Sequence, residues 1–328
     1  MSALSAVYGG VARVRRSWYE RRPQSRVRLA RPVVSVGNLV VGGSGKTPVV
    51  AALAATLSRL GYRPAILSRG YGRTTRSHDV VVVSDGARAL VPVEASGDEP
   101  QMLARELTGV PIVVAADRAR AGQVAIERFD ATVLILDDGF QHLRLERTLD
   151  LLVLSWADLS EKVLPAGRLR EPPGAARSAD AVLAYGGAAE AERIAAAVHV
   201  SRAFTVTTRH LPLRSVRQPA PVARVGARVA GVTGIARPER FFDALRRQRF
   251  DVVREFTFPD HHWFTAADLE SIERHARQRG AEAIVTTSKD AVRVERHLTD
   301  AMLPWSVLPL EVFIEPAAGF ESWLRQTL

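Results

Sequence analysis

Short apolar runs alternate along much of the chain with segments that show the 3.6-residue period of helices. The runs are rich in β-branched residues and apolar at nearly every position, which is typical of strands buried on both faces of a parallel sheet. The pattern therefore predicts an α/β fold with a mostly parallel sheet and helices on both faces. The expected strands are Val33–Val36, Ala65–Leu67, Val80–Val83, Ile112–Val114, Val133–Leu136, Leu151–Leu154 and Ala181–Ala184, and the clearest helices are Val49–Leu60, Gln101–Leu107 and Arg118–Glu127.

The rhythm breaks at residues 204–225, where polar and apolar residues alternate briefly and prolines follow. We interpret this stretch as an inter-domain connection that contains a strand. A second α/β unit is expected after it, with strands at Arg228–Val232, Val252–Phe258 and Ala283–Thr287 and helices at Glu239–Arg247 and Ala266–Arg279. We therefore predict four parts: an N-terminal segment (1–31), a core domain (32–203), the connection (204–225) and a smaller C-terminal α/β domain (226–328).

The N-terminal segment has the pattern of an amphipathic helix. An apolar stripe at helical spacing is formed by Leu4, Val7, Tyr8, Val11, Val14 and Trp18. Arginines crowd its C-terminal half, and residues 1–31 hold eight Arg and one Glu. An apolar face beside clustered cations is typical of a helix that lies in a membrane interface rich in acidic headgroups. The alternative is a helix that packs on its own domain with its arginines in water.

Most of the net positive charge of the chain lies in this N-terminal segment. The net charge is +10, but residues 1–31 carry +7 of it, so the remainder is nearly balanced at +3. This distribution disfavours a nucleic-acid-binding surface.

No run approaches the roughly 20 apolar residues of a spanning helix, and the positive charges follow the first apolar stretch, whereas a secretory signal has them before it. We expect the chain to remain in the cytoplasm. The absence of Cys excludes disulfides and thiolate metal sites.

The strongest chemical signal is a Gly-rich turn between the first expected strand and the first expected helix. The residues that we expect to bind ATP are Val40, Val41, Gly42, Gly43, Ser44, Gly45, Lys46 and Thr47. Glycines let successive backbone N–H groups converge on phosphate oxygens, and the helix N-terminus adds its positive dipole end. Lys46 would reach the β- and γ-phosphates, and Thr47 would offer its hydroxyl to Mg²⁺. The strict motif has Gly in place of Val40, but the other features indicate a nucleoside triphosphate site in a P-loop NTPase-like fold.

An acidic partner for this loop is expected at the end of another core strand. The strand at Val133–Leu136 is followed by Asp137, Asp138 and Gly139. A carboxylate in that place can hold Mg²⁺ directly or through water. The alternative is an ordinary Asp-Gly turn at the end of a strand.

Several uncommon strings follow one another in a fixed order. They are Val36–Pro48, Ser68–Arg73, Gly97–Pro100, Asp137–His142, Pro165–Pro172, Phe258–His262 and Thr286–Asp290. In this combination the chain resembles the tetraacyldisaccharide 4′-kinases, the lipid A 4′-kinases of Gram-negative envelope synthesis. The resemblance extends from the N-terminal helix to about residue 295.

The resemblance implies an enzyme that uses ATP and Mg²⁺ to phosphorylate the 4′-hydroxyl of a tetraacylated glucosamine disaccharide 1-phosphate, the lipid A precursor, giving lipid IVA. It also implies a peripheral protein at the cytoplasmic face of the inner membrane, with the anionic membrane surface as a partner. Neither a nucleic acid nor an obligatory protein partner is expected.

The resemblance assigns the proton transfer to two residues. Asp98 matches the family's general base, and His261 matches the histidine that supports it. We hypothesise an Asp98–His261 pair, because a lone carboxylate is a weak base for an alcohol. The residues alone allow another interpretation, in which Asp98 and Glu99 are acids that favour the first turn of a helix at Pro100.

Further residues are expected around the phosphates and the lipid headgroup. Arg170 is expected to neutralise charge on the transferring phosphoryl group. The expected metal ligands are Thr47, Asp137, Asp138, Gln141 and Glu99, and the expected substrate-binding residues are Arg69, Tyr71, Arg73 and Glu171. From the pattern alone, Arg170 and Glu171 are an ordinary surface ion pair, and the other arginines are solvated in a flexible turn. Ser288–Asp290 is similar to base-reading motifs of P-loop proteins, although a helix start explains it equally well.

Two other classes of function are weighed against the kinase. A membrane-associated P-loop switch or maturation ATPase would hydrolyse nucleotide without a lipid acceptor, but it does not need the strings at Gly97–Pro100 and Pro165–Pro172. A nucleic-acid-dependent NTPase is disfavoured because the charge outside the N-terminal segment is nearly balanced.

Overall fold

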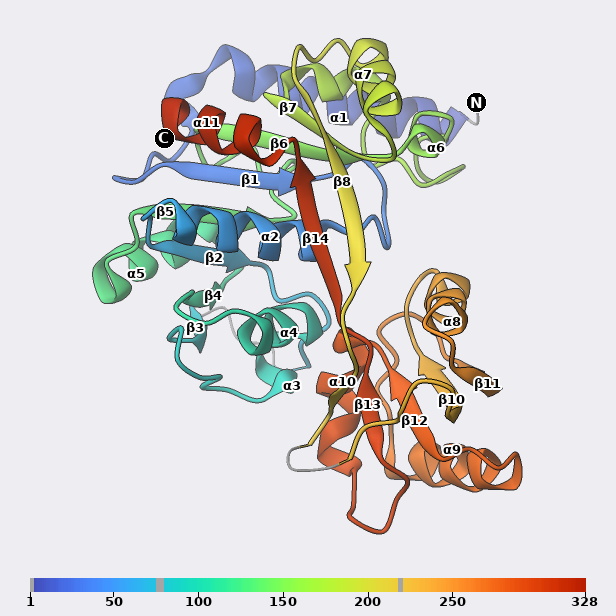
Figure 1. Cartoon of the computed structure of the whole chain (residues 1–328). Coiled ribbons are helices and arrows are strands. Elements are labelled where there is room, and N and C mark those ends of the chain that lie inside the picture. Colours follow the sequence, from blue (N-terminus) through green and yellow to red (C-terminus); the bar gives the residue numbers. More distant parts are fainter. Residues whose placement is uncertain (1–2, 75–79, 218–220) are drawn as a thin grey trace.

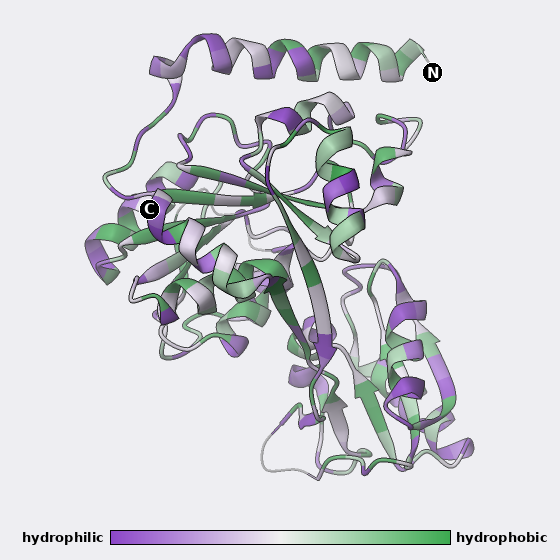
Figure 2. Cartoon of the chain, turned by 45° about the horizontal axis from the view of Figure 1, so that its top comes forward, coloured by the Kyte–Doolittle hydropathy of each residue, from purple (hydrophilic) through white to green (hydrophobic). Residues whose placement is uncertain are grey.

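The computed structural model of the chain describes residues 3–74, 80–217 and 221–328. Two lobes are evident, a larger one built on a nine-stranded sheet and a smaller one built on a five-stranded sheet (Figure 1). The N-terminal helix lies on the larger lobe, on the side away from the smaller one (Figures 1 and 2).

The larger sheet has the strand order β14-β8-β7-β6-β1-β5-β2-β4-β3. Neighbouring strands are parallel except at the two edges, where β3 pairs with β4 and β14 pairs with β8 in antiparallel fashion. The strands are β1 (Val33–Gly37), β2 (Pro64–Ser68), β3 (Val81–Ser84), β4 (Ile112–Val114), β5 (Val133–Asp137), β6 (Leu149–Leu154), β7 (Ala181–Tyr185), β8 (Ala203–His210) and β14 (Leu310–Glu315). Every residue of β1 is buried, as the continuous apolar run predicts.

Helices cover both faces of this sheet. Alternate residues of β1 divide between the faces, with Val34 and Val36 in one apolar cluster and Val33 in another. The first face packs against α2 (Lys46–Arg59), α4 (Asp98–Glu106) and α11 (Ala317–Thr327), and the second against α5 (Arg118–Phe129) and α7 (Ala188–Ala197). Two one-turn helices, α3 (Val93–Ser96) and α6 (Trp156–Leu159), lie in connections. The predicted fold class is confirmed.

The smaller lobe repeats this plan on a smaller scale. Its sheet has the order β11-β10-β12-β13-β9, parallel except for the β13–β9 pair. The elements are β9 (Arg214–Ser215), β10 (Arg228–Thr233), α8 (Pro238–Arg247), β11 (Asp251–Thr257), α9 (Ala266–Gln278), β12 (Ala283–Thr286), α10 (Ser288–Val294) and β13 (Trp305–Val307).

The predicted boundaries of the C-terminal domain are wrong at both sides. The connection assigned to 204–225 begins inside β8, which is a strand of the larger sheet, and part of that segment (218–220) lies outside the described residues. Residues 310–328, assigned to the smaller domain, form β14 and α11 of the larger lobe. The C-terminal segment returns to the larger lobe because α11 buries Phe320 and Trp323 against Phe204 of β8. The ring centroids of Phe320 and Trp323 lie 4.9 and 5.6 Å from that of Phe204.

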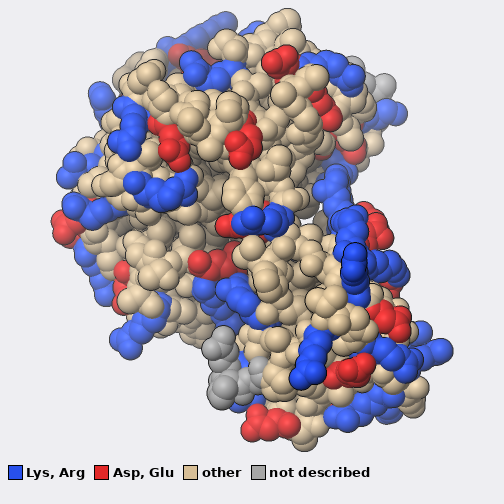
Figure 3. Space-filling model, in the orientation of Figure 1, with Lys and Arg blue, Asp and Glu red and all other residues tan. Residues whose placement is uncertain are grey.

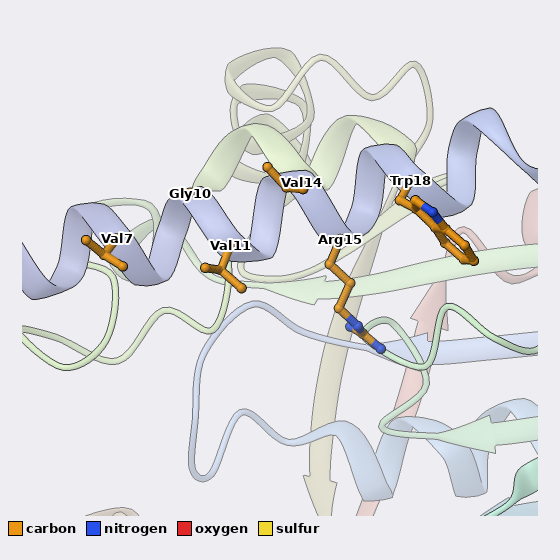
Figure 4. Close-up of a pocket in the computed structure, with 6 residues that line it drawn as sticks. All are labelled: Val7, Gly10, Val11, Val14, Arg15 and Trp18. Carbon is orange, nitrogen blue, oxygen red and sulfur yellow. The ribbon is translucent and has the colours of Figure 1, made fainter.

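The predicted N-terminal helix is present as α1 (Ala3–Arg21). Its stripe faces solvent, with exposed fractions from 41% at Tyr8 to 71% at Val14. Four stripe residues, Val7, Val11, Val14 and Trp18, line an apolar surface hollow along the helix (Figure 4). The helix does pack on its own domain, as the alternative holds, but the face toward the larger lobe buries Ser5, Gly9 and Arg16 and leaves the stripe exposed. The part of the alternative that places the arginines in water is wrong for Arg16. In the described part of the chain no helix is long and apolar enough to cross a membrane.

Candidate active site

The Gly-rich loop lies between β1 and α2, with Gly45 as the residue before the helix. Gly45 has a φ of +76°, and a Cβ there would lie 2.3 Å from the hydroxyl of Tyr185, so only Gly fits. The Tyr185 hydroxyl donates a hydrogen bond to the Gly45 carbonyl at 3.0 Å. Lys46 is the first residue of α2, and its Nζ donates to Asn38 Oδ1 at 3.1 Å and to Ser44 Oγ at 3.4 Å. Strand, tight turn and helix start are thus arranged as a phosphate-binding loop.

Val40 and Val41, predicted to bind ATP, support the loop instead. Val40 is buried and forms a bridge with Leu169, while the Val41 N–H donates to the Arg168 carbonyl at 2.8 Å. The Arg168 guanidinium in turn donates to the Val41 carbonyl at 2.8 and 3.2 Å. Because the N–H and the carbonyl of Val41 already have partners within the protein, neither backbone group of Val41 is free to bind phosphate. Arg168 therefore holds the loop in place; it lies within the Pro165–Pro172 string, but no role was predicted for it.

The two carboxylates at the end of β5 face this loop. Asp138 has a φ of +58° and lies between two cations, with Oδ1 3.3 Å from Lys46 Nζ and Oδ2 2.7 Å from Arg170. Burial alone would raise the pKa of Asp138, but the charges of Lys46 and Arg170 outweigh it and lower the pKa. Asp137 accepts only a long bond from Ser68 at 3.4 Å. Burial, with the charges of Glu99 and Asp138, raises the pKa of Asp137 to about 7.

These residues fit a divalent cation. Asp137 Oδ1 is buried and accepts no hydrogen bond, and Asp138 Oδ1 is buried with the Lys46 ammonium 3.3 Å away; both are hard oxygen atoms of the kind that a divalent cation prefers. No group of three acidic or His side chains among the described residues is arranged to hold a metal by itself. Two carboxylates are nonetheless a suitable set for Mg²⁺, which usually takes one or two carboxylates and completes its shell with phosphate oxygens and water.

Gln141 and Glu99, also predicted as metal ligands, occupy different places. The Gln141 amide donates to the Asn38 carbonyl at 3.0 Å, and its Oε1 accepts from Arg170 at 3.4 Å. Gln141 therefore braces the loop and Arg170. Glu99 lies 3.6 Å from Lys289 Nζ and close enough to Asp137 for its charge to affect that carboxylate.

The predicted contact between Asp98 and His261 is present across the two lobes. Asp98 begins α4 in the larger lobe and is 3% exposed, whereas His261 lies in the loop after β11 of the smaller lobe. His261 Nδ1 is 2.9 Å from Asp98 Oδ2. Asp98 Oδ1 accepts from the Glu99 N–H at 3.0 Å, so the first-turn interpretation holds as well.

Two further cations of the smaller lobe point at the same carboxylate. Arg293 lies 3.4 Å and Lys289 4.0 Å from Asp98 Oδ2. Burial would raise the pKa of Asp98, but the hydrogen bond from His261 and the charges of Lys289 and Arg293 outweigh it and lower the pKa. The Lys289 ammonium also donates toward His261 Nε2 at 3.2 Å. With Nε2 accepting, the ring proton resides on Nδ1 and points at Asp98.

Lys289 resolves the two interpretations of Ser288–Asp290. Thr287 caps α10, and Asp290 accepts from Thr287 Oγ1 at 2.7 Å and Thr233 Oγ1 at 2.9 Å, which fixes the helix start. Lys289 extends into the cluster around Asp98 and bonds Asp260 at 3.1 Å. Its neighbours are carboxylates and His261, which is no environment for reading a base. Burial alone would lower the pKa of Lys289, but the charges of Glu99, Asp98 and Asp260 raise it.

The predicted substrate-binding loop borders this cluster. Gly97, with a φ of +87°, would place a Cβ 2.4 Å from the Tyr71 carbonyl, so its lack of a side chain lets the loop approach Asp98. Tyr71 is exposed, and its ring lies 5.2 Å from that of His261. Arg69 is exposed and Arg73 half-buried beside the same loop. The structure thus groups three of the predicted substrate residues at the mouth of the site.

The fourth, Glu171, lies elsewhere. It is 4% exposed and takes the fork of Arg16 from α1, with both carboxylate oxygens bonded at 2.7 and 2.8 Å. Both the substrate-binding role and the surface ion pair with Arg170 are therefore wrong for Glu171, because its charge is already satisfied inside the larger lobe. Arg16 gave no separate signal in the sequence, since it stands among many arginines.

One more buried cation completes the site. Arg118 begins α5, is buried, and donates to the Ala116 carbonyl at 2.8 Å. Burial and the nearby charge of Arg69 lower the pKa of Arg118 to about 10, against the opposing charges of Asp138 and Asp137. Acidic and basic side chains accordingly gather where the two lobes meet (Figure 3).

Comparison with known proteins agrees with this geometry. A family profile described as tetraacyldisaccharide-1-P 4′-kinase matches residues 1–328. The chain belongs to this family. Curated members named tetraacyldisaccharide 4′-kinase include one from Geobacter sulfurreducens, 40% identical over 99% of this chain and 92% of its own length. Another, from Syntrophus aciditrophicus, is 39% identical over 94% of this chain and 87% of its own.

A solved structure of the family has the same fold. The kinase of Aquifex aeolicus, described as an "apo" form in complex with ATP, superposes with a TM-score of 0.79 at 30% identity. The match covers 99% of this chain and 97% of that one. The fold described above is therefore shared with that member of the family.

Proposed function

We propose that this chain transfers the γ-phosphoryl group of ATP to the 4′-hydroxyl of a tetraacylated glucosamine disaccharide 1-phosphate, giving lipid IVA and ADP. Family membership supports the reaction. The observation that carries the assignment of the site is the Asp98–His261 contact, which adds a base to the phosphate-binding loop at the junction of the lobes. A switch ATPase has no use for such a pair, so that alternative is not favoured.

In this proposal the phosphate-binding loop and its cations bind and orient ATP. The backbone N–H groups of Gly42–Gly45 surround the phosphates, and Lys46 moves from Asp138 to the β- and γ-phosphates. Thr47, Asp137 and Asp138 would hold Mg²⁺, which screens the phosphate charge when bound. Arg170, held by Asp138 and Gln141, faces the charge that develops on the transferring group.

Asp98 acts on the acceptor. Its carboxylate takes the proton of the 4′-hydroxyl as that oxygen attacks the γ-phosphorus and the bond to the β-phosphate oxygen breaks. The Nδ1–H of His261 keeps one carboxylate oxygen bonded, which orients the other lone pairs toward the alcohol. Arg69, Tyr71 and Arg73 are proposed to contact the anionic headgroup at the mouth of the site.

The proposed location is the cytoplasmic face of the inner membrane. The exposed stripe of α1 and the arginines beside it support binding to an anionic lipid surface, where the acceptor resides. The hollow along α1 presents the apolar side chains that such a surface would cover.

The reaction is tested by following the label of γ-labelled ATP. The protein is incubated with ATP, Mg²⁺ and a tetraacyl disaccharide 1-phosphate dispersed in detergent. Label on the lipid, located at the 4′ position by mass fragmentation, is the expected result. Release of the label as free phosphate, with the lipid unlabelled, would overturn the proposal in favour of an ATPase.

A further inference from the structure

The buried face of α1 is connected to the centre of the site. The Arg16 guanidinium is buried and makes four hydrogen bonds to the larger lobe: two to Glu171, one to Ser178 Oγ at 2.9 Å and one to the Phe140 carbonyl at 3.3 Å. It also lies over the Phe140 ring, 4.3 Å from its centroid. These buried contacts exceed what is needed to hold an interfacial helix on the lobe, because a solvent-exposed arginine could do that without being buried.

Two of the three residues that Arg16 bonds, Glu171 and Phe140, belong to segments that build the phosphate site. Glu171 follows Arg170, whose N–H donates to the Leu39 carbonyl at 2.7 Å and whose guanidinium bonds Asp138. Phe140 precedes Gln141, which braces Arg170 and the Asn38 carbonyl. Arg16 therefore clamps together the two segments that meet at Arg170.

A second arginine of α1 reinforces the clamp. Arg15 extends from the helix toward the larger lobe (Figure 4) and donates to the Gln141 carbonyl at 3.1 Å. The network is continuous from α1 through Gln141 and Arg170 to Asp138 and then Lys46, whose Nζ is 3.3 Å from Asp138. Each step is a charged or hydrogen-bonded contact of fixed direction, so a shift of α1 changes the setting of Arg170.

We propose that Arg16 is a positioning residue for phosphoryl transfer, which places Arg170 through Glu171 and Phe140 and so makes α1 part of the catalytic scaffold. This rests on the proposed function, because it takes Arg170 as the group that faces the transferring phosphoryl. The exposed stripe and the buried Arg16 lie on opposite sides of one helix, with Arg15 at the edge of the stripe, so the helix proposed to meet the lipid also holds the side chain that places Arg170.

The test separates positioning from membrane attachment and from folding. Because a single change would leave a buried charge unpaired, the main variant is the double change Arg16→Met and Glu171→Met, which replaces the pair with apolar side chains of similar size. The control is Arg325→Met, at an exposed arginine of α11 in the same lobe to which no role in binding or catalysis is assigned. Turnover is measured with detergent-dispersed lipid, so that binding to vesicles is not required, and folded protein is quantified by thermal melting.

We expect the double variant to lose about tenfold or more in kcat while Arg325→Met stays within about twofold of wild type. In an Arg170→Ala background, the same double change should cost less than about twofold, because its target is already gone. An Arg16→Lys variant, which keeps the charge but loses the fork, should fall between wild type and the double variant.

Three results would overturn the proposal. The first is a double variant as active as Arg325→Met. The second is an equal loss of kcat with and without Arg170, which would show a purely structural role. The third is an Arg170→Ala variant with normal kcat, which would remove the proposed role of Arg170 as well. The first two leave the proposed function standing, so the two failures are distinguishable.

Discussion

At the scale of single residues, the surroundings of Asp98 decide what the site can do. A buried carboxylate would normally be protonated more easily, yet the hydrogen bond from His261 and two cations of the smaller lobe hold Asp98 in the ionised form. A carboxylate that stays ionised over a wide pH range can accept a proton throughout that range, although its lowered pKa makes it a weaker base. Lys289 serves both partners, since it neutralises charge near Asp98 and directs the ring proton of His261 toward it.

The first prediction concerns pH. In Lys289→Met the stabilising ammonium is lost, so the protonated form of Asp98 is favoured and its pKa rises relative to wild type. The acid limb of the kcat/KM profile should therefore move to higher pH, whereas Lys162→Met, at an exposed lysine, should leave the limb in place. The measurement is a pH series at limiting lipid. A limb that does not move would show that Lys289 has no influence on the base.

From the residues alone, groups joined by local sequence were predictable and those joined by the fold were not. The Asp98–His261 pair, 163 positions apart, was predicted only through the family resemblance. The roles of Lys46 and Thr47 could be predicted because the strand, the glycines and the helix start lie in one short stretch. Asp137 could be predicted because it stands at the end of a strand. Lys289 gave only a weak sign, as one of three lysines in the chain. Glu171 was placed wrongly because its partner Arg16 lies 155 positions away, and no local pattern reports such a contact.

At the scale of elements, α1 has two faces with different chemistry. The outer face exposes six apolar residues of the stripe, and the inner face buries the Arg16–Glu171 pair. The hydrophobic periodicity correctly predicted the helix and its stripe. It could not predict that an arginine would be the anchor, because burial of a charge depends on the partner that the folded lobe supplies.

The second prediction tests the outer face. Replacing Val7, Val11 and Val14 together by Ser removes apolar area that would insert into lipid, at about 1 kcal/mol or more for each valine. Sedimentation with anionic vesicles should weaken about 100-fold, with ATP binding unchanged. The matched control is Val225→Ser, an equally exposed valine of the smaller lobe. Undiminished sedimentation of the triple variant would rule out the stripe as the membrane contact.

The third prediction tests the inner face through stability. Arg16→Met alone leaves the carboxylate of Glu171 buried without its partner, which should lower the free energy of unfolding by about 3–5 kcal/mol. The double change Arg16→Met and Glu171→Met should recover most of that loss, and Arg21→Met should stay within about 0.5 kcal/mol. Urea denaturation measures all three. Equal stability of the single and double variants would contradict the buried pair.

At the scale of the whole molecule, the alternating pattern predicted the parallel sheet but not its edge. β1 to β7 come from runs whose apolar periodicity is evident without knowledge of their neighbours. β14 was missed because it follows the smaller lobe in the sequence and pairs with β8, about 100 residues earlier. As a result, two antiparallel strands of the larger sheet lead into and out of the smaller lobe (Figure 1).

This connection matters because the candidate base is completed only where the lobes meet. Asp98 belongs to the larger lobe, whereas His261, Lys289 and Arg293 all come from the smaller one. Neither lobe alone contains the pair, so the position of the smaller lobe controls the proton acceptor. The central claim is that this pair removes the proton of the lipid hydroxyl during transfer.

The most direct measurement is a single-turnover rate of label transfer from ATP to lipid, with enzyme in excess over labelled ATP. Asp98→Asn and His261→Ala should each lower that rate by about 100-fold or more, while the Kd for ATP stays within about threefold of wild type. Lys162→Met should transfer label at the wild-type rate. If either site variant transferred label within about threefold of wild type, with ATP binding intact, the pair would not be the base.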